Sequence, residues 1–291
     1  MEIIRRFSEV IAGTMTWGIW GRNFSTTEME QMIHHCVDLN ITSFDHADIY
    51  GDYTTEAAFG KALKQSNLSR DKVQLITKCG IQLPNGVRKN NIKHYNYSKD
   101  YIIQSVEQSL INLQTEYLDL LLLHRPSPLM QADEIALAVT TLREQGKIID
   151  FGVSNFTPSQ TEWIQTAIEV QFNQIEFSVS HWHAMTDGSL DYMQTHHIRP
   201  MSWASLGKIL NSTDDRAIRI RSTAANIANR YEASIATILI SWITKHPSQI
   251  IPVFGTTERE RIQQMKKATE ITLSDEEWFE LWSASMGQPV P

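Results

Sequence analysis

Short apolar runs alternate with longer segments of helical periodicity along almost the whole chain, and this alternation restricts the possible folds more than any other feature. Most of the runs are continuously apolar rather than alternating, which is typical of strands buried on both faces of a parallel sheet. The candidate strands are Val10–Thr16, Ile41–Phe44, Val73–Thr77, Leu118–Leu123, Ile148–Val153, Gln171–Phe177, Arg199–Trp203 and Ile250–Phe254.

The segments between these runs place apolar residues three and four positions apart, as amphipathic helices do. We expect Ser25 or Thr26 to cap the first helix, Pro158 to lie in the first turn of another, and Gly146 to end a third. The helices predicted are Thr26–Leu39, Thr55–Leu63, Lys99–Leu113, Asp133–Gln145, one opening at Thr157-Pro158, Asp191–His197, Asp214–Arg230, Ser234–Lys245, Glu258–Ala268 and Ser274–Ser283.

Eight β-then-α units in 291 residues predict an α/β fold, the (β/α)8 TIM barrel, as a single domain over residues 1–291. A doubly wound open sheet is the alternative, but six strands would suffice for it. We expect the segment Met1–Ser8 to form a short hairpin or cap before the first strand.

The composition argues against several classes of protein. Lys and Arg number 26 against 33 Asp and Glu, a net charge of −7, whereas a nucleic-acid scaffold normally has a basic face. The apolar runs are far shorter than the ~20 residues of a membrane span. Two isolated cysteines, Cys36 and Cys79, and a start without an apolar signal region predict a cytoplasmic protein. The oligomeric state stays open, with a monomer favoured.

Polar residues stand where the apolar runs end, and in a (β/α)8 barrel reactive side chains lie at the C-terminal ends of the strands. Because these ends converge on one mouth, we expect a single active site there. The residues found at these positions are Asp45 and Tyr50, Lys78, His124, Ser154 and Asn155, Gln174, Trp203 and Ser205, and Gly255 and Thr256.

Asp45, Tyr50, Lys78 and His124 together have the chemistry needed to protonate a developing alkoxide. A lysine pointing into a core needs a partner, which Asp45 can supply, although a purely structural ion pair is the alternative. A cation about 4 Å from a phenol lowers its pKa from about 10 by up to roughly three units. We therefore expect Lys78 to bring the pKa of Tyr50 towards neutrality, and a neutral His124 to orient a substrate oxygen.

An alkoxide develops when hydride adds to a carbonyl, so this chemistry requires a nicotinamide cofactor. The chain contains neither the dinucleotide fingerprint G-x-G-x-x-G nor a phosphate loop, so we expect loops at the barrel mouth to hold the cofactor. Ser154, Asn155 and Gln174 have the donors and acceptors that the carboxamide needs. Trp203 offers a flat face for stacking on the nicotinamide ring.

The adenosine end of the cofactor is expected at the last strand. Gly255 and Thr256 are followed by Arg259 and Arg261 at the opening of a helix, where an adenosine phosphate can bind. A solvated helix face is the alternative for the two arginines, because glutamates alternate with them.

Several motifs, in order along nearly the whole chain, resemble signatures of the aldo-keto reductase superfamily, in particular its bacterial NADPH-dependent oxidoreductases. They include Asp45–Gly51, Ile76–Lys78, Leu118–His124 and Gly152–Phe156. The resemblance implies a (β/α)8 barrel that reduces aldehydes or ketones to alcohols with NADPH, with NADH as a possible substitute. It also implies that Tyr50 is the acid/base, Lys78 and Asp45 its tuning pair, and His124 the group that orients the substrate.

The same resemblance implies that Ser205, Leu206 and Lys208 run along the pyrophosphate. Gln264 lies in the segment that contacts the adenine, at a position where family members commonly have glutamate. The lysine–serine pair usual for the 2′-phosphate is absent, and Arg259 or Arg261 is expected to replace it.

Two alternatives to an enzyme of this kind are a nicotinamide-sensing regulatory subunit with weak or no turnover, and a metal-dependent barrel hydrolase that uses His181 and His183. We expect no metal, because H-x-H supplies only two ligands. His181, Trp17 and Trp20 are instead expected to line the binding site of a small carbonyl substrate.

Overall fold

The computed structural model describes residues 7–290, so most of the expected hairpin or cap at Met1–Ser8 lies outside the described residues. Eight parallel strands, with helices between them, close into a barrel in the order β1-β10-β9-β8-β7-β6-β3-β2. The predicted (β/α)8 fold is therefore confirmed. The chain divides into two compact units between Asn173 and Gln174, within β8, and the single domain stays a prediction.

Each strand of the barrel falls on one of the predicted apolar runs; β6 and β9 have the predicted bounds, and the other strands have shifted ends. Lys78 lies inside its strand rather than after it. The strands are β1 (Ile11–Gly13), β2 (Ser43–Asp45), β3 (Gln74–Cys79), β6 (Leu118–Leu123), β7 (Ile148–Ser154), β8 (Phe172–Glu176), β9 (Arg199–Trp203) and β10 (Ile251–Phe254).

The predicted helices are also found, most of them within two residues of the expected bounds. They are α1 (Thr26–Asp38), α3 (Thr55–Gln65), α4 (Lys99–Leu113), α5 (Ala132–Glu144), α6 (Pro158–Gln165), α7 (Ser189–Thr195), α8 (Asp215–Arg230), α9 (Ile235–Thr244), α10 (Arg259–Lys267) and α11 (Asp275–Met286). None of the described helices is long and apolar enough to span a membrane.

The helix ends follow from side chains near them in the sequence. Ser25 caps α1 in a capping box with Glu28, and Thr157 caps α6, whose first residue is Pro158. Gly146 follows the end of α5 with φ +67°, a left-handed conformation that glycine adopts without strain. The predicted helix ends are therefore set by local chemistry.

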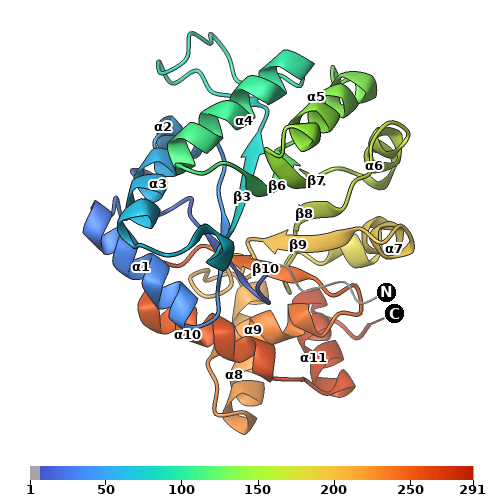
Figure 1. Ribbon diagram of the computed structural model, residues 1–291. Helices are drawn as coiled ribbons and strands as arrows, with labels where there is room; N and C mark the ends of the chain where they lie inside the picture. Colours follow the sequence, from blue (N-terminus) through green and yellow to red (C-terminus); the bar gives the residue numbers. More distant parts are fainter. Residues whose placement is uncertain (1–6, 291) are drawn as a thin grey trace. The chain divides into compact units, whose positions relative to one another are not determined.

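The first unit contains parallel strands whose register brings Asp45 level with Ile76, and Lys78 level with Leu122. Outside the strands, α3 and α4 lie side by side (Figure 1). They approach closely at Gly60, where an added Cβ would lie 2.2 Å from the carbonyl oxygen of Asn112. A larger residue would therefore push the two helices apart.

The second unit is built around stacked aromatic rings. Trp242 is fully buried and lies parallel to Trp278, with ring centroids 4.8 Å apart, and it also stacks on Phe177. The two indole N–H groups each donate to the other residue's backbone carbonyl, at 3.0 and 2.9 Å. The rings are thus buried without leaving their polar atoms unpaired.

The first unit also contains a hairpin and a short helical turn that were not predicted. Strands β4 (Ile81–Gln82) and β5 (His94–Tyr95) pair in an antiparallel hairpin, and α2 (Tyr50–Tyr53) is a turn with left-handed residues rather than a regular helix. The hairpin strands have two residues each, too few to produce a periodic pattern in the sequence.

Candidate active site

Asp45 and Lys78 form a buried ion pair on neighbouring strands. The Lys78 ammonium donates to both carboxylate oxygens of Asp45 at 2.7 Å and to the backbone oxygen of His46 at 2.8 Å. The side chains of Lys78 and Asp45 are only 1% and 4% exposed, respectively. Burial opposes the charge of Lys78, but Asp45 and Tyr50 raise its pKa above the usual value. The lysine is therefore charged at neutral pH.

Tyr50 is held beside this pair by the turn that follows β2. Lys78 donates to the phenol oxygen at 3.3 Å, so the predicted meeting of phenol and ammonium is observed. The predicted direction of the pKa is wrong, however: burial raises the pKa of Tyr50 above 10 and outweighs the lowering by Lys78. Asp45 adds to the rise because its carboxylate offsets much of the lysine's charge. Tyr50 is consequently a protonated phenol at neutral pH.

His124 follows β6 and is fixed by its backbone N–H, which donates to the carbonyl of Cys79 at 3.0 Å. Its ring lies edge-on to that of Tyr50, with centroids 6.1 Å apart. Burial and the nearby Lys78 lower the pKa of His124 well below its usual value, so the ring is neutral at pH 7. Its Nδ1 atom is buried, with no hydrogen-bond partner among residues 7–290. The four residues singled out from the sequence therefore gather in one cluster.

The two tryptophans expected at the substrate site occupy different environments. Trp20 is 40% exposed and its ring centroid lies 6.2 Å from that of Tyr50, beside the cluster. Trp17 is fully buried and packs against the rings of Phe24, Phe44 and Phe59. We therefore exclude Trp17 from the substrate site, because it is a core residue of the first unit.

Ser154 and Asn155 lie at the end of β7 in the first unit. Ser154 is buried, and Asn155 adopts a left-handed conformation (φ +62°) and donates from its side-chain amide to the Ser154 hydroxyl at 2.8 Å. Asparagine tolerates this conformation better than most residues. The strand end thus presents a hydroxyl and an amide next to each other.

The second unit contains the other expected cofactor residues. Gln174 is buried in β8, and Trp203 ends β9 partly exposed. The buried Ser205 hydroxyl donates to the carbonyl of Ser202 at 2.8 Å, which anchors the turn that also contains Leu206 and the exposed Lys208. The same hydroxyl also lies 3.2 Å from the carbonyl oxygen of Val253, so the turn is fixed to both β9 and β10.

The residues expected at the adenosine end surround the start of α10. Gly255 follows β10, and the Thr256 hydroxyl accepts from the backbone N–H of Glu258 at 3.2 Å. Arg259 and Arg261 are both exposed in the first turn, whereas the backbone carbonyl of Gln264 accepts from the Thr237 hydroxyl at 3.2 Å.

His181 lies exposed after β8, with Nδ1 3.9 Å from the carboxylate of Glu176 and its ring 5.7 Å from that of His183. Across residues 7–290, no group of three or more His, Cys, Asp or Glu side chains is placed to hold a metal ion.

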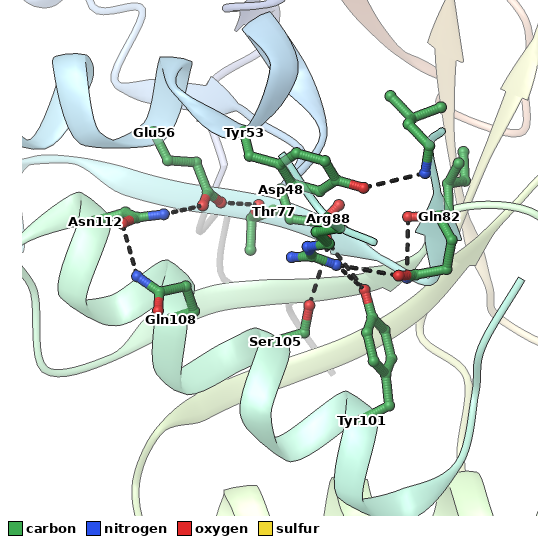
Figure 2. A network of polar contacts seen from close by, with 12 residues as sticks. Asp48, Tyr53, Glu56, Thr77, Gln82, Arg88, Tyr101, Ser105, Gln108 and Asn112 are labelled. Atoms are coloured by element: carbon green, nitrogen blue, oxygen red, sulfur yellow. Dashed lines mark hydrogen bonds and ion pairs between the residues drawn. The ribbon is translucent and has the colours of Figure 1, made fainter. Parts of the chain in front are cut away.

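A polar network centred on Asp48 and Arg88 was missed at the level of sequence (Figure 2). Asp48 is 5% exposed, and its carboxylate accepts from Ser105 at 3.1 Å and from Tyr101 at 3.3 Å. Burial and the neighbouring Glu56 raise the pKa of Asp48 to about 7. The signal available was a second aspartate, Asp48, in the stretch between Asp45 and Tyr50.

Comparison with known proteins gives consistent results. The sequence profile described as "Aldo/keto reductase family" matches residues 9–285. The chain is 40% identical to the oxidoreductase YdhF of Escherichia coli, over 98% of this chain and 96% of that one. It is 36% identical to a 6-dehydroglucose reductase of Agrobacterium fabrum, over 100% of both chains. A solved aldo/keto reductase of Klebsiella pneumoniae, in complex with NADP and acetate, superposes with a TM-score of 0.79 at 25% identity, covering 98% of this chain and 95% of that one.

Proposed function

Because this chain belongs to the aldo/keto reductase family, we propose that it reduces aldehyde or ketone carbonyls to alcohols with NADPH, and that Tyr50 donates the proton. One observation carries the proposal: the phenol of Tyr50 lies 3.3 Å from the ammonium of Lys78, which is bonded to both oxygens of Asp45. A proton donor beside a fixed cation is the arrangement that protonation of an alkoxide requires.

The raised pKa of Tyr50 suits the role of an acid. At neutral pH the phenol holds its proton until an oxygen of higher basicity, such as an alkoxide, forms next to it. The phenolate left behind then lies beside the Lys78 ammonium, which stabilises it. His124, neutral at this pH, donates a hydrogen bond that holds the substrate oxygen near Tyr50.

The cofactor residues are proposed on the chemistry of their side chains. A carboxamide has one acceptor oxygen and two donor hydrogens, and the hydroxyl of Ser154 with the amides of Asn155 and Gln174 match both kinds. We assign Trp203 to stacking on the nicotinamide, and Ser205, Leu206, Lys208, Gly255, Thr256 and Gln264 to the remainder of the dinucleotide. When bound, NADPH supplies the hydride.

Preference for NADPH over NADH is assigned to Arg259 and Arg261, two exposed cations at the start of α10. A guanidinium suits a 2′-phosphate because its donors match the phosphate oxygens. Replacing both arginines by glutamine should weaken NADPH binding at least tenfold in a fluorescence titration and leave NADH binding within twofold. An equal loss for both cofactors would reject the assignment.

Trp20 and His181 are proposed to contact the substrate. Trp20 is exposed beside Tyr50, which suits a small carbonyl compound with an apolar part. Trp20→Ala should raise KM more than it lowers kcat, whereas a fall in kcat alone would place Trp20 outside the binding site.

The central test compares Tyr50→Phe with Tyr117→Phe, a matched loss of one hydroxyl elsewhere in the first unit. NADPH oxidation is followed with a panel of aromatic and aliphatic aldehydes, and NADPH binding by fluorescence. We expect Tyr50→Phe to lose at least a thousandfold in kcat with NADPH binding unchanged, and Tyr117→Phe to behave as wild type. Unchanged turnover in Tyr50→Phe would reject the acid role. NADPH binding by the wild type without turnover of any aldehyde would favour the regulatory subunit.

A further inference from the structure

The hairpin formed by β4 and β5 is fastened to the turn that carries Tyr50. Ile81 of β4 is buried in one apolar cluster with Ala47 and Ile49, and Tyr50 packs against this cluster together with Tyr95 of β5. The hairpin therefore contacts the catalytic turn directly, although some 30 residues separate them in the sequence.

The turn that follows Tyr50 has an unusual backbone. Gly51, Asp52 and Tyr53 all have positive φ angles, of 56°, 54° and 69°. Residues other than glycine rarely adopt this conformation, and they keep it only where surrounding contacts hold them. Gly51 adopts it without strain, whereas Asp52 and above all Tyr53 depend on the surrounding contacts.

The hairpin supplies contacts to the two non-glycine residues of this turn. The Asn85 side-chain amide donates to the carboxylate of Asp52 at 3.0 Å. The backbone N–H of Leu83 donates to the Tyr53 hydroxyl at 3.2 Å. Both hairpin residues lie in the loop between β4 and β5.

Arg88, in the same loop, makes the most extensive link (Figure 2). Its guanidinium lies over the Tyr53 ring, 4.0 Å from the centroid, and donates to the Tyr101 hydroxyl at 2.7 Å. It also forms an ion pair with the buried Asp48 at 3.9 Å. The backbone N–H of Asp48 in turn donates to the carbonyl of Lys78 at 3.0 Å. Arg88 thus holds the chain on both sides of Tyr50, at Asp48 and at Tyr53.

We propose that Arg88 is a positioning residue, which clamps the left-handed turn after Tyr50 through Tyr53 and Asp48 and so keeps the phenol within reach of Lys78. The proposal rests on the proposed acid role of Tyr50 and deepens it. Loss of the clamp allows the turn to relax towards ordinary backbone angles. Displacement of a proton donor by about 1 Å costs up to roughly a hundredfold in rate.

Arg70 of the first unit serves as a control for Arg88, because it allows an effect on the position of Tyr50 to be distinguished from a general loss of stability. Arg70 lies over the ring of Tyr117 at 3.9 Å and pairs with the buried Asp119 at 2.7 Å, so it repeats the surroundings of Arg88. Arg70 precedes β3. Among residues 7–290, its hydrogen bonds go neither to the hairpin loop nor to the turn after Tyr50.

The experiment compares Arg88→Met, Arg88→Lys and Arg70→Met in the full chain. Steady-state reduction of an aldehyde is measured at pH 8, above the pKa of Asp48, together with NADPH binding and urea unfolding. We expect kcat to fall ten- to a hundredfold in Arg88→Met with NADPH binding unchanged. Arg88→Lys should fall between Arg88→Met and wild type, because its ammonium pairs with Asp48 but cannot also bond Tyr101. Arg70→Met should lose stability and keep kcat within twofold.

The outcomes distinguish the two proposals. Equal kcat values in Arg88→Met and Arg70→Met, with Tyr50→Phe inactive, would overturn the clamp and leave the acid role intact. Full activity in Tyr50→Phe would overturn both. If Arg88→Met does not fold, Asn85→Ala serves instead. It removes the contact with Asp52 and one hydrogen bond within the hairpin loop, from the backbone N–H of Val87. Unchanged kcat in that variant would count against the clamp.

Discussion

The ion pair of Lys78 and Asp45 provides a quantitative test of the site's architecture. Both side chains are almost fully buried, and the ammonium lies 2.7 Å from each carboxylate oxygen. Removing one partner of such a pair leaves a buried charge without its counter-ion, which costs about 3–5 kcal/mol. We therefore expect Lys78→Met and Asp45→Asn each to lower the free energy of unfolding by this amount. Replacing both removes the stranded charge, so the double variant should lose about 1–3 kcal/mol less than the sum of the two.

Urea unfolding followed by circular dichroism measures all three variants. Lys147→Met is the control, because Lys147 makes a 2.6 Å ion pair with Glu107 that is partly open to solvent, with side chains 27% and 46% exposed. Pairs of that kind contribute less than about 1 kcal/mol. The reasoning fails if Lys78→Met costs no more than Lys147→Met, or if the two buried substitutions are additive.

Three further predictions concern the first unit. Trp17→Ala should lower the free energy of unfolding by about 3–5 kcal/mol in urea while KM stays unchanged, because the ring is core and not substrate site; a raised KM at full folding would contradict this. Gly80→Ala should cost at least about 1–3 kcal/mol in the same measurement, since φ is +112° and the new Cβ would lie 2.0 Å from the Tyr97 ring; a neutral effect would show that the ring moves freely. Asp48→Asn should change the pH dependence of stability. The folded protein holds the Asp48 proton with a pKa of about 7 against 3.8 unfolded, so this group's contribution is lost as pH rises from 4 to beyond 7. The variant should therefore gain about 3–4 kcal/mol on wild type between pH 4 and pH 8, and a pH-independent difference would refute the assignment.

Much of the candidate active site followed from residue order alone. Asp45 and Lys78 stand at the ends of neighbouring apolar runs, and parallel strands bring such positions to the same edge. A buried lysine requires a counter-ion, and Asp45 supplies a carboxylate at the end of the neighbouring run. His124 and Ser154 followed from the same rule, because each stands directly after its own apolar run.

The fold was equally accessible from local patterns. Strands buried on both faces are apolar throughout, and amphipathic helices carry apolar residues three and four positions apart. Both patterns can therefore be recognised in the sequence. Residues at helix ends, such as Ser25 and Pro158, act within four positions, which is why their predicted places at the start of a helix hold in the structure.

The tertiary structure decided what depends on distant neighbours. The sequence predicted a phenol acidified by Lys78, but burial and the carboxylate of Asp45 reverse the direction of the Tyr50 pKa shift, and burial is a sum over every surrounding atom. Trp17 is buried among phenylalanine rings, whereas Trp20 is 40% exposed beside Tyr50, and their neighbours along the chain do not predict this difference. Arg88 and Asp48 form an ion pair although they lie 40 positions apart in the sequence. The hairpin that brings them together has strands too short to give a periodic pattern of apolar residues. The sequence by itself therefore determines which side chains are present and at the end of which strand each one lies. The packing of the folded chain determines the charge state, backbone strain and solvent accessibility of these residues.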